Sequence, residues 1–507
     1  MMKSKKLFDG FLLKVLLISV AIMFFPVLMV AQITLKGDSA PINPDFTKYM
    51  ENLRAGNIEE FTDSGYPLGL IPSPIDRSYM KSEKVSKPPA LRVPPASYDL
   101  RTASPARLTP IKDQLLCGSC WAFATYGSLE SCQQTQSYSA TPPDYSENNL
   151  KNTHGFDKPC CSGGNFDMST AYLAKWAGPI AEASDVYNGS DPNPCSSPGG
   201  LSPVKHIQKV IYLPGRQNST DNDTIKNAVM TYGAVSILMR WEDAYYNNTN
   251  RAYYYSGGST TTNHGVCIVG WDNSFDRTKF PIPYPTANGA FIVRNNWGST
   301  WGEAGYFFAS YEDKVLSYNT NSVFVGIEPT NNFNVIYQYD PFGWTTAYGY
   351  GSSTAYFANK FTATSSDPLK AAGFYVTAPN SSYELWAYLN PNAGPINTDG
   401  IGVHKSGTIA DAGYNTIVFD TPLALFNGQT FSVVVKLTTT GYGFPIPLEQ
   451  DLAGYSSSAN ASAGQSYVSL NGVSYVDITT EPGYSKTNVC LKAYAGGTTS
   501  VANWQLY

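Results

Sequence analysis

The sequence predicts an α+β unit followed by an all-β sandwich, and three patterns carry this prediction. Residues 120–133 contain no proline and repeat apolar side chains at helical spacing. The later runs HGVCIVGW and AFIVRNNW alternate in the manner of strands with one buried face. Beyond Pro329 the chain changes to short β-type runs separated by Gly, Pro, Asn and Ser clusters. A length of 507 residues accommodates two or three such units.

The amino terminus is typical of an export signal. Lysines at positions 3, 5 and 6 precede an apolar stretch from Val15 to Val30 that closes on Ala31, a small residue suited to cleavage. We therefore expect a signal peptide over residues 1–31 and a secreted or cell-surface protein. An uncleaved membrane anchor is the alternative, because a stretch of this length lies near the lower limit for crossing a bilayer. No later segment is apolar enough to span a membrane.

Two further segments follow before the carboxy-terminal unit. Residues 32–93 are polar and rich in Pro and Ser, which favours a short pro-segment with one short helix near Phe46–Leu53. Residues 94–326 hold every residue with catalytic promise. We expect a helical half with Cys120 to pack against a β half with His264 and Asn295, leaving the active-site cleft between them.

Composition excludes some classes of partner. Only 14% of residues are charged, and the net charge of −5 is spread along the chain. No Lys/Arg cluster could neutralise a run of phosphates, so nucleic acid is not an expected partner. The residue pattern implies no metal and no organic cofactor.

The run from Gln114 to Phe123, QLLCGSCWAF, is the most informative stretch of the sequence. Cys120 stands where a helix is expected to begin. Unpaired N–H groups and the positive end of the helix dipole favour a thiolate there, which is the reactive form of cysteine. For a lone cysteine in an exported chain, a structural or disulfide role is the alternative.

A reactive thiol needs a nearby base, and the base needs a third group that fixes its tautomer and orientation. The chain has four histidines. His264 follows Cys120 by about 145 residues, and Asn295 follows in RNNWG roughly 30 residues later, an order and spacing typical of papain-like enzymes.

With these motifs, residues from about Pro94 to Gly326 resemble the papain and cathepsin family of cysteine peptidases. The resemblance implies Cys120 as nucleophile, His264 as proton acceptor and donor, and Asn295 as its orienting group. It also implies Gln114 as an oxyanion-hole donor and Trp297 as a shield over the Asn–His hydrogen bond. Expected substrates are proteins or peptides.

The segment CCSGG is similar to the family's CxGG motif. The resemblance implies a Cys117–Cys161 disulfide and close approach of substrate backbone at Gly163 and Gly164. We pair the neighbouring Cys160 with Cys195. The remaining cysteines, Cys132, Cys267 and Cys490, are expected to be free. Of these, Cys132 and Cys267 are expected to act as small buried hydrophobes.

The resemblance also locates a specificity pocket, for the second residue before the scissile bond. Its expected lining is Phe166, Leu238 and Gly265, so we expect an apolar side chain to be preferred there. The pro-segment departs from the family, because it lacks the long helical pattern of cathepsin precursors. The means by which latency is kept is therefore open.

The β unit at residues 331–497 resembles the lectin-like domain that follows the peptidase in some secreted prokaryotic members of the family. Four of its aromatics could stack on sugars: Trp344, Tyr356, Trp386 and Tyr388. Alternating strand aromatics also commonly point into a core. A carbohydrate or cell-surface ligand, a structural cap and a protein-docking surface are the alternatives.

Three functions compete. The first is an endopeptidase that forms an acyl-enzyme thioester. The second is a catalytically silent adhesin, although such a protein has no chemical need for Gln114, Cys120, His264 and Asn295 at these spacings. The third is another cysteine enzyme, such as a transglutaminase or a cell-wall amidase, which the CGSCW and NNWG motifs do not resemble.

Overall fold

The computed structural model describes residues 36–81, 92–189, 195–400 and 402–498. From Asp38 onward these residues belong to one structural unit. The signal peptide expected over residues 1–31 lies outside the described residues. Within the described ranges, none of the helices is both long and apolar enough to cross a membrane.

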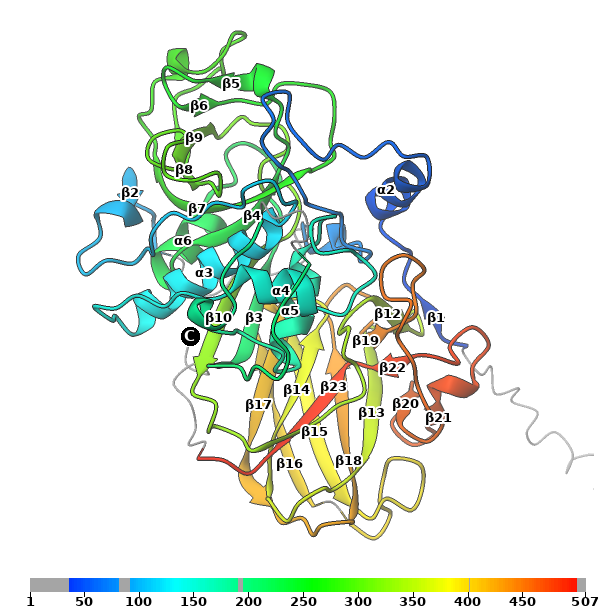
Figure 1. Cartoon of the computed structure of the whole chain (residues 1–507). Helices are drawn as coiled ribbons and strands as arrows, with labels where there is room; N and C mark the ends of the chain where they lie inside the picture. Colours follow the sequence, from blue (N-terminus) through cyan, green and yellow to red (C-terminus); the bar gives the residue numbers. More distant parts are fainter. Residues whose placement is uncertain (1–35, 82–91, 190–194, 401, 499–507) are drawn as a thin grey trace, which may run out of the picture. The chain divides into compact units, whose positions relative to one another are not determined.

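The helical half is built around α3 (Cys120–Gln136), which is buried on nearly every side. Glu130 is its single charged residue, which is why the helix can lie in the interior. Two shorter helices, α4 (Glu147–Thr153) and α5 (Phe166–Ala174), lie near it (Figure 1). The side chains of Ser146 and Asn165 cap them by accepting hydrogen bonds from backbone N–H groups.

The β half begins with β2 (Ser97–Asp99), which pairs with β7. Its other strands are β3 (His206–Leu213), β4 (Val235–Met239), β5 (Tyr246–Asn247), β6 (Ala252–Tyr253), β7 (His264–Asp272), β8 (Ala290–Arg294), β9 (Tyr306–Ser310) and β10 (Asn321–Glu328). The helix α6 (Asp223–Tyr232) packs beside β7. The expectation of one buried face on β7 and β8 is wrong, because both strands are buried throughout, apart from Asp272.

Close packing of α3 on β7 explains that difference. Gly127 faces the strand, and a Cβ there would lie 3.1 Å from Sγ of Cys267. The thiol of Cys267 in turn donates to the carbonyl of Ala124, at 3.2 Å. The helix therefore covers the face of β7 that an alternating pattern assigns to water.

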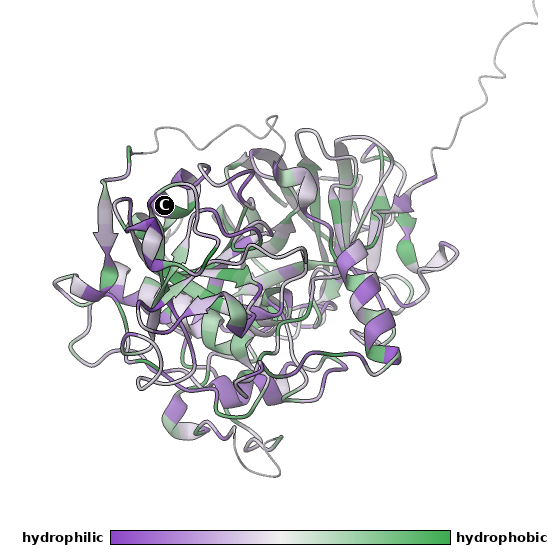
Figure 2. Cartoon of the chain, turned by 90° about the horizontal axis from the view of Figure 1, so that it is seen from above, coloured by the Kyte–Doolittle hydropathy of each residue, from purple (hydrophilic) through white to green (hydrophobic). Residues whose placement is uncertain are grey.

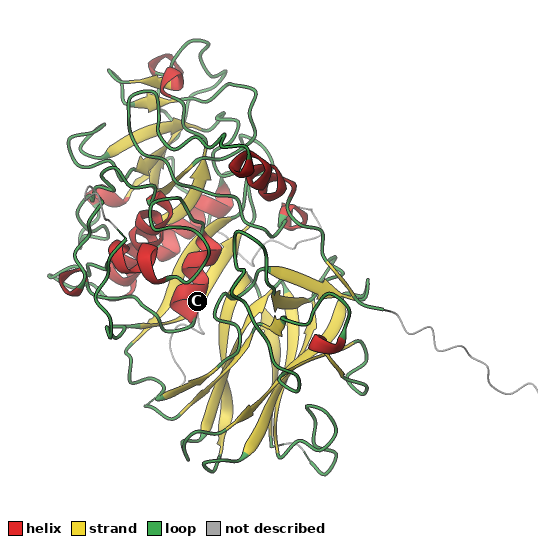
Figure 3. Ribbon diagram, turned by 45° about the vertical axis from the view of Figure 1, so that its right-hand side comes forward, coloured by secondary structure: helices red, strands yellow, loops and turns green. Residues whose placement is uncertain are grey.

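The carboxy-terminal unit is a sandwich of two sheets, visible in the lower part of Figure 1 and in Figure 3. Strands of the first sheet are β11 (Val335–Tyr337), β14 (Leu369–Val376), β17 (Ala412–Leu423) and β23 (Leu491–Ala495). The second sheet has the order β16-β15-β18-β13-β20-β21. It consists of β13 (Thr354–Thr362), β15 (Ser381–Leu389), β16 (Val403–Ile409), β18 (Thr430–Thr438), β20 (Ser466–Ser469) and β21 (Val476–Asp477). Buried apolar side chains from both sheets form one core, as expected for a sandwich.

One sheet is continuous across the two folded units. Its order is β11-β23-β14-β17-β3-β10-β4-β7-β8-β9-β6-β5. The junction is the antiparallel pair β17–β3, in which Gly413 lies opposite Ile211 and Tyr414 opposite Val210. The fold class predicted from sequence, a papain-like two-lobed unit followed by an all-β sandwich, is confirmed.

The amino-terminal segment is attached to both units. Its strand β1 (Asp38–Ser39) pairs with β12 (Thr346–Gly349), which continues to β19 (Ile446–Glu449) and β22 (Asn488–Val489) in a four-stranded sheet. Helix α2 (Pro44–Arg54) follows, close to the predicted short helix. Figure 2 shows hydrophobic colour mainly on interior strands and purple on much of the outer surface, including α2.

Substitution of Gly413 tests the strand junction. This residue has φ +120°, and a Cβ would lie 2.1 Å from the carbonyl oxygen of Val210. We expect Gly413→Ala to lower the free energy of unfolding by roughly 2–3 kcal/mol more than Gly428→Ala does. Gly428 also has positive φ, but no atom would lie within 4 Å of its Cβ. Equal denaturant midpoints for the two variants would contradict this prediction.

Candidate active site

The thiol of Cys120 lies where α3 meets β7. Cys120 is the first residue of α3 and is completely buried. The backbone N–H of Gly265, in β7, donates to its Sγ at 3.4 Å. Burial raises the pKa of the thiol to about 12, although backbone N–H groups partly oppose this shift. The thiol is therefore neutral in this arrangement.

His264 starts β7 and faces Asn295, which follows β8. Its Nε2 lies 2.9 Å from Oδ1 of Asn295. Because the amide oxygen can only accept, Nε2 carries the proton and Nδ1 keeps its lone pair. Among the described residues, Nδ1 has no hydrogen-bond partner. Burial lowers the pKa of His264 to about 4, so the ring is neutral.

Trp297 covers this pair. Its ring is stacked on His264 with centroids 4.7 Å apart, and only 3% of the residue is exposed. A shielded hydrogen bond in a dry environment is stronger than the same bond in water. The geometry thus suits the shielding role that the sequence suggested.

Gln114 is held in one orientation by a residue that sequence reasoning missed. Nδ2 of Asn296 donates to Oε1 of Gln114 at 2.6 Å, and the backbone N–H of Gln114 donates to the carbonyl of Asn296 at 2.9 Å. Since Oε1 is engaged, Nε2 of Gln114 is the donor end, and it donates to the carbonyl of Cys117 at 2.8 Å as well as to that of Leu68. Asn296 immediately follows Asn295, but its sequence position alone does not reveal this contact.

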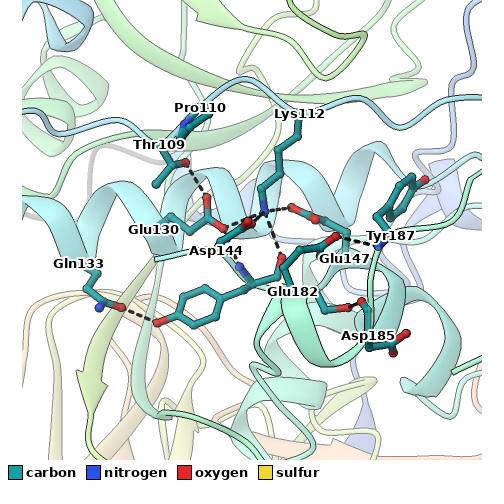
Figure 4. A network of polar contacts seen from close by, with 12 residues as sticks. Thr109, Pro110, Lys112, Glu130, Gln133, Asp144, Glu147, Glu182, Asp185 and Tyr187 are labelled. Atoms are coloured by element: carbon teal, nitrogen blue, oxygen red, sulfur yellow. Dashed lines mark hydrogen bonds and ion pairs between the residues drawn. The ribbon is translucent and has the colours of Figure 1, made fainter. Parts of the chain in front are cut away.

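A buried ionic network holds the segment that precedes Gln114 (Figure 4). Nζ of Lys112 lies 2.9 Å from Glu130, 2.7 Å from Asp144 and 2.9 Å from Glu147. Glu130 and Glu147 are almost completely buried. Burial raises the pKa of Glu147 to about 8, with Lys112 opposing and Glu130 reinforcing the shift. Burial of two carboxylates beside one lysine therefore favours the protonated form of Glu147.

The amino-terminal segment runs through the cleft and explains why the site is buried. The carbonyl of Leu68 accepts a hydrogen bond from Nε2 of Gln114 at 3.2 Å, and that of Pro67 accepts one from Nε1 of Trp297 at 3.0 Å. Gly69 comes so close that a Cβ would lie 2.3 Å from the backbone of Gly118. Residues 67–69 therefore occupy the space in front of Gln114 and Trp297.

The same segment pairs with the CCSGG loop. Leu70 lies parallel to Gly164, whose N–H donates to Gly69 O and whose carbonyl accepts from Ile71 N–H, both at 3.0 Å. Gly164 also faces Trp121, where a Cβ would lie 2.3 Å from the indole. The preceding Gly163 has φ +91°. Both glycines thus lie beside an extended backbone, as the sequence suggested.

A cavity of about 330 Å³ adjoins this segment and contains Phe166 and Leu238 in its wall. Gly265 does not line it, since it lies against Cys120 and Trp121 instead. Asp167 also lines the cavity and is paired with Arg77. Sequence reasoning missed this charged residue, which directly follows Phe166.

The cysteines lie as follows. Disulfides join Cys117 to Cys161 and Cys160 to Cys195, the same pairs that were expected. The first bridge holds the turn before α3 against the CCSGG loop, where Gly118 N–H donates to Cys161 O at 3.2 Å. The free cysteines besides Cys120 are all buried: Cys132, Cys267 and Cys490.

A chain of contacts thus connects a thiol, an imidazole with an available lone pair and an amide donor: Cys120 lies against the residue after His264, His264 pairs with Asn295, and the next residue holds Gln114. Such a set can support acyl transfer through a covalent thioester. The described residues that meet here are the four that the sequence singled out: Gln114, Cys120, His264 and Asn295.

Comparisons with known proteins agree with both units. Residues 94–325 match the family model described as papain family cysteine protease, and residues 336–495 match the one described as lectin like domain. Vignain of Ricinus communis is 28% identical over 215 residues, covering 42% of this chain and 53% of the relative. A viral cathepsin of Heliothis zea nuclear polyhedrosis virus is 30% identical over 218 residues, covering 43% and 53%. The chain thus spans about half the length of these curated relatives.

Solved structures extend the likeness to both units. The cysteine protease and lectin-like domains of Cwp84, a surface layer associated protein of Clostridium difficile, superpose with a TM-score of 0.76. That match has 24% identity and covers 91% of this chain and 98% of the other. A point variant of the clostridial cysteine protease Cwp84, after propeptide cleavage, has a TM-score of 0.67, 26% identity and coverage of 79% and 99%.

The Lys112 network predicts a pH dependence of stability. The pKa of Glu147 is raised in the folded state, so its contribution is present below about pH 4.5 and is lost as the pH rises towards 8. We expect Glu147→Gln to flatten the fall in unfolding free energy over this range, by up to about 1.4 kcal/mol per pH unit. Denaturant titrations between pH 5 and 8 measure this change of the unfolding free energy with pH. Glu51→Gln, on an exposed part of α2, is the control and should keep the wild-type slope; identical slopes in both variants would refute the assignment.

Proposed function

We propose that this chain, which carries a papain-family cysteine protease domain followed by a lectin-like domain, is a secreted cysteine endopeptidase. In this proposal residues 1–31 are a signal peptide, 32–93 a pro-segment, 94–326 the peptidase and 331–497 the lectin-like domain. The hydrogen bond between His264 Nε2 and Asn295 Oδ1 is the observation that carries it, since it leaves the other ring nitrogen available as a base. The likeness to a surface layer associated protein supports a location at the cell surface.

The reaction would proceed by transfer of the Cys120 proton to Nδ1 of His264. The thiolate attacks the scissile carbonyl carbon, and the oxygen that becomes negative is stabilised by Nε2 of Gln114 and the backbone N–H of Cys120. The imidazolium then protonates the leaving amine, which gives an acyl-enzyme thioester. Water, deprotonated by His264, hydrolyses the thioester and regenerates the thiol. Asn295 keeps the ring oriented throughout.

The chain with its amino-terminal segment in place is the latent form. Leu68 takes the donor of Gln114, and burial disfavours both the thiolate of Cys120 and the imidazolium of His264. Removal of the segment would hydrate the cleft and bring the two pKa values towards each other. Gly163 and Gly164 would then pair with substrate backbone, and Phe166 and Leu238 would contact a side chain. Gly265 would act indirectly, because its backbone N–H donates to the thiol of Cys120.

Labelling of the secreted, processed protein with an epoxide inhibitor selective for papain-type thiols tests this proposal first. We expect modification at Cys120, and loss of both labelling and peptide hydrolysis in Cys120→Ala, because the reactive thiolate is gone. Cys267→Ala removes a buried free thiol outside the cleft and should leave both unchanged. Folded, processed wild-type protein that takes up no label and cuts no peptide would overturn the enzyme proposal.

Carbohydrate binding is a second proposed function, for the lectin-like domain. On the outer face of its six-stranded sheet, Trp386 stacks near His404 with centroids 5.1 Å apart and near Tyr356 at 6.5 Å. Tyr388 is half-buried on the same strand as Trp386. Partly exposed aromatics beside polar groups are suited to sugar rings. Trp344 is only 1% exposed and belongs to the core, so its inclusion among sugar-stacking residues is wrong.

A glycan array probed with the full chain tests this role. We expect binding by wild type and roughly two- to tenfold weaker binding by Trp386→Ala, because an aromatic stacking contact contributes roughly 0.5–1.5 kcal/mol beyond its buried area. Phe426→Ala, on an exposed residue elsewhere in the domain, should bind as wild type does. No glycan bound by wild type would remove the sugar proposal and favour the structural-cap or docking role.

A further inference from the structure

Arg77 of the amino-terminal segment is buried in a pocket shaped for its side chain. Only 7% of the residue is exposed. Its Nη2 lies 2.7 Å from Oδ1 of Asp167, and its Nη1 lies 3.2 Å from Oδ2. Such a bidentate pair matches the planar fork of a guanidinium to a carboxylate.

Two aromatic rings complete the pocket. Cζ of Arg77 lies 4.4 Å from the ring centroid of Tyr212 and 4.5 Å from that of Trp344. Tyr212 belongs to β3 of the peptidase, and Trp344 to the lectin-like domain. Rings at these distances attract a cation, most strongly away from water. We name the set Asp167, Tyr212 and Trp344 the guanidinium pocket.

The guanidinium pocket opens on the cavity that adjoins the amino-terminal segment. Asp167 and Tyr212 line the same cavity as Phe166 and Leu238. Many of the residues in the wall of this cavity belong to the amino-terminal segment, from Asn43 to Lys81. Among the other described residues in its wall, Asp167 is the one that carries a charge.

Departure of Arg77 leaves Asp167 without its ionic partner. A guanidinium that enters the pocket in its place would regain the bidentate pair with Asp167 and the contacts with the two rings. We propose that in the processed enzyme the guanidinium pocket binds an arginine side chain of the substrate, at the second or third residue before the scissile bond. The stem of that side chain lies on Phe166 and Leu238, and its head reaches Asp167.

This proposal rests on the proposed peptidase function and modifies the expected apolar preference. An arginine stem is itself apolar and can pack on the two hydrophobic residues. Lysine can occupy the pocket with a single charge but without the bidentate fork. If the pocket served only to hold the pro-segment, the processed enzyme would not distinguish charged from neutral side chains of equal shape.

Paired peptide substrates test the proposal on wild-type enzyme. Each pair carries arginine or citrulline, its uncharged near-isostere, at the second or at the third position before the scissile bond. We expect kcat/KM to be at least about tenfold higher for arginine at one of these positions, because hydrogen bonds to charged groups are the stronger ones. Equal values at both positions would overturn the proposal.

Variants assign the effect to Asp167. Asp167→Asn alone would leave Arg77 of the precursor buried without its ionic partner. The double variant Arg77→Gln/Asp167→Asn therefore removes both charges together. It should lose the arginine advantage, measured as the ratio of kcat/KM for the arginine peptide to kcat/KM for the citrulline peptide. Asp223→Asn, on the exposed start of α6, should keep the advantage. An advantage that persists in the double variant would also overturn the proposal.

Binding distinguishes this proposal from the peptidase proposal. The dissociation constants of the same peptides can be measured with full-length Cys120→Ala protein from which the amino-terminal segment has been removed by proteolysis after folding. Tighter binding of the arginine peptide would support the pocket even if wild type hydrolysed nothing, in which case only the peptidase proposal fails. Equal binding of both peptides would overturn the guanidinium pocket whatever the hydrolysis.

Discussion

The close approach of α3 to β7 is the constraint on which the rest of the site depends. Sγ of Cys120 accepts a hydrogen bond from the backbone N–H of Gly265, and the backbone of Gly265 lies against that of Trp121. His264 is the residue before Gly265, so this one contact brings thiol and imidazole to the same place. Asn295, Asn296 and Trp297 then complete the site from the loop after β8. The helix, in turn, can be this deeply buried because Glu130 is its single charge and is neutralised by Lys112.

The amino-terminal segment uses the same contacts that a substrate would need. It engages Gln114 and Trp297 at one end of the cleft and Gly164 in the middle. Farther along, Tyr79 stacks on Tyr442 of the lectin-like domain with ring centroids 3.8 Å apart. Under the proposed function, this largely extended segment would keep the enzyme latent without a long helical pro-domain, because it contacts both folded units.

Local patterns made the fold and the central site predictable, whereas contacts distant in sequence did not. The helix at Cys120 and the strand at His264 follow from residue spacing, and the sandwich from short apolar runs between turn residues. The second buried face of β7 depends on α3 packing across it, which an alternating sequence pattern does not indicate. Arg77 and Asp167 are separated by 90 residues, and each alone looks like a surface charge. The hydrogen bond from Asn296 to Gln114 could not be predicted either, because it joins two loops that are distant in the sequence.

The strand pair β3–β17 gives the molecule a mechanical character that two domains on a flexible linker would lack. A pull between the domains is carried by a ladder of backbone hydrogen bonds and by the shared core beside it. The hydrogen bonds between β17 and β3 would have to break together before the two strands separate. A small pulling force would therefore leave the neighbouring strands β3, β10, β4 and β7 in register. Under such a load the peptidase unit would keep its shape, whereas two domains on a flexible linker would move apart.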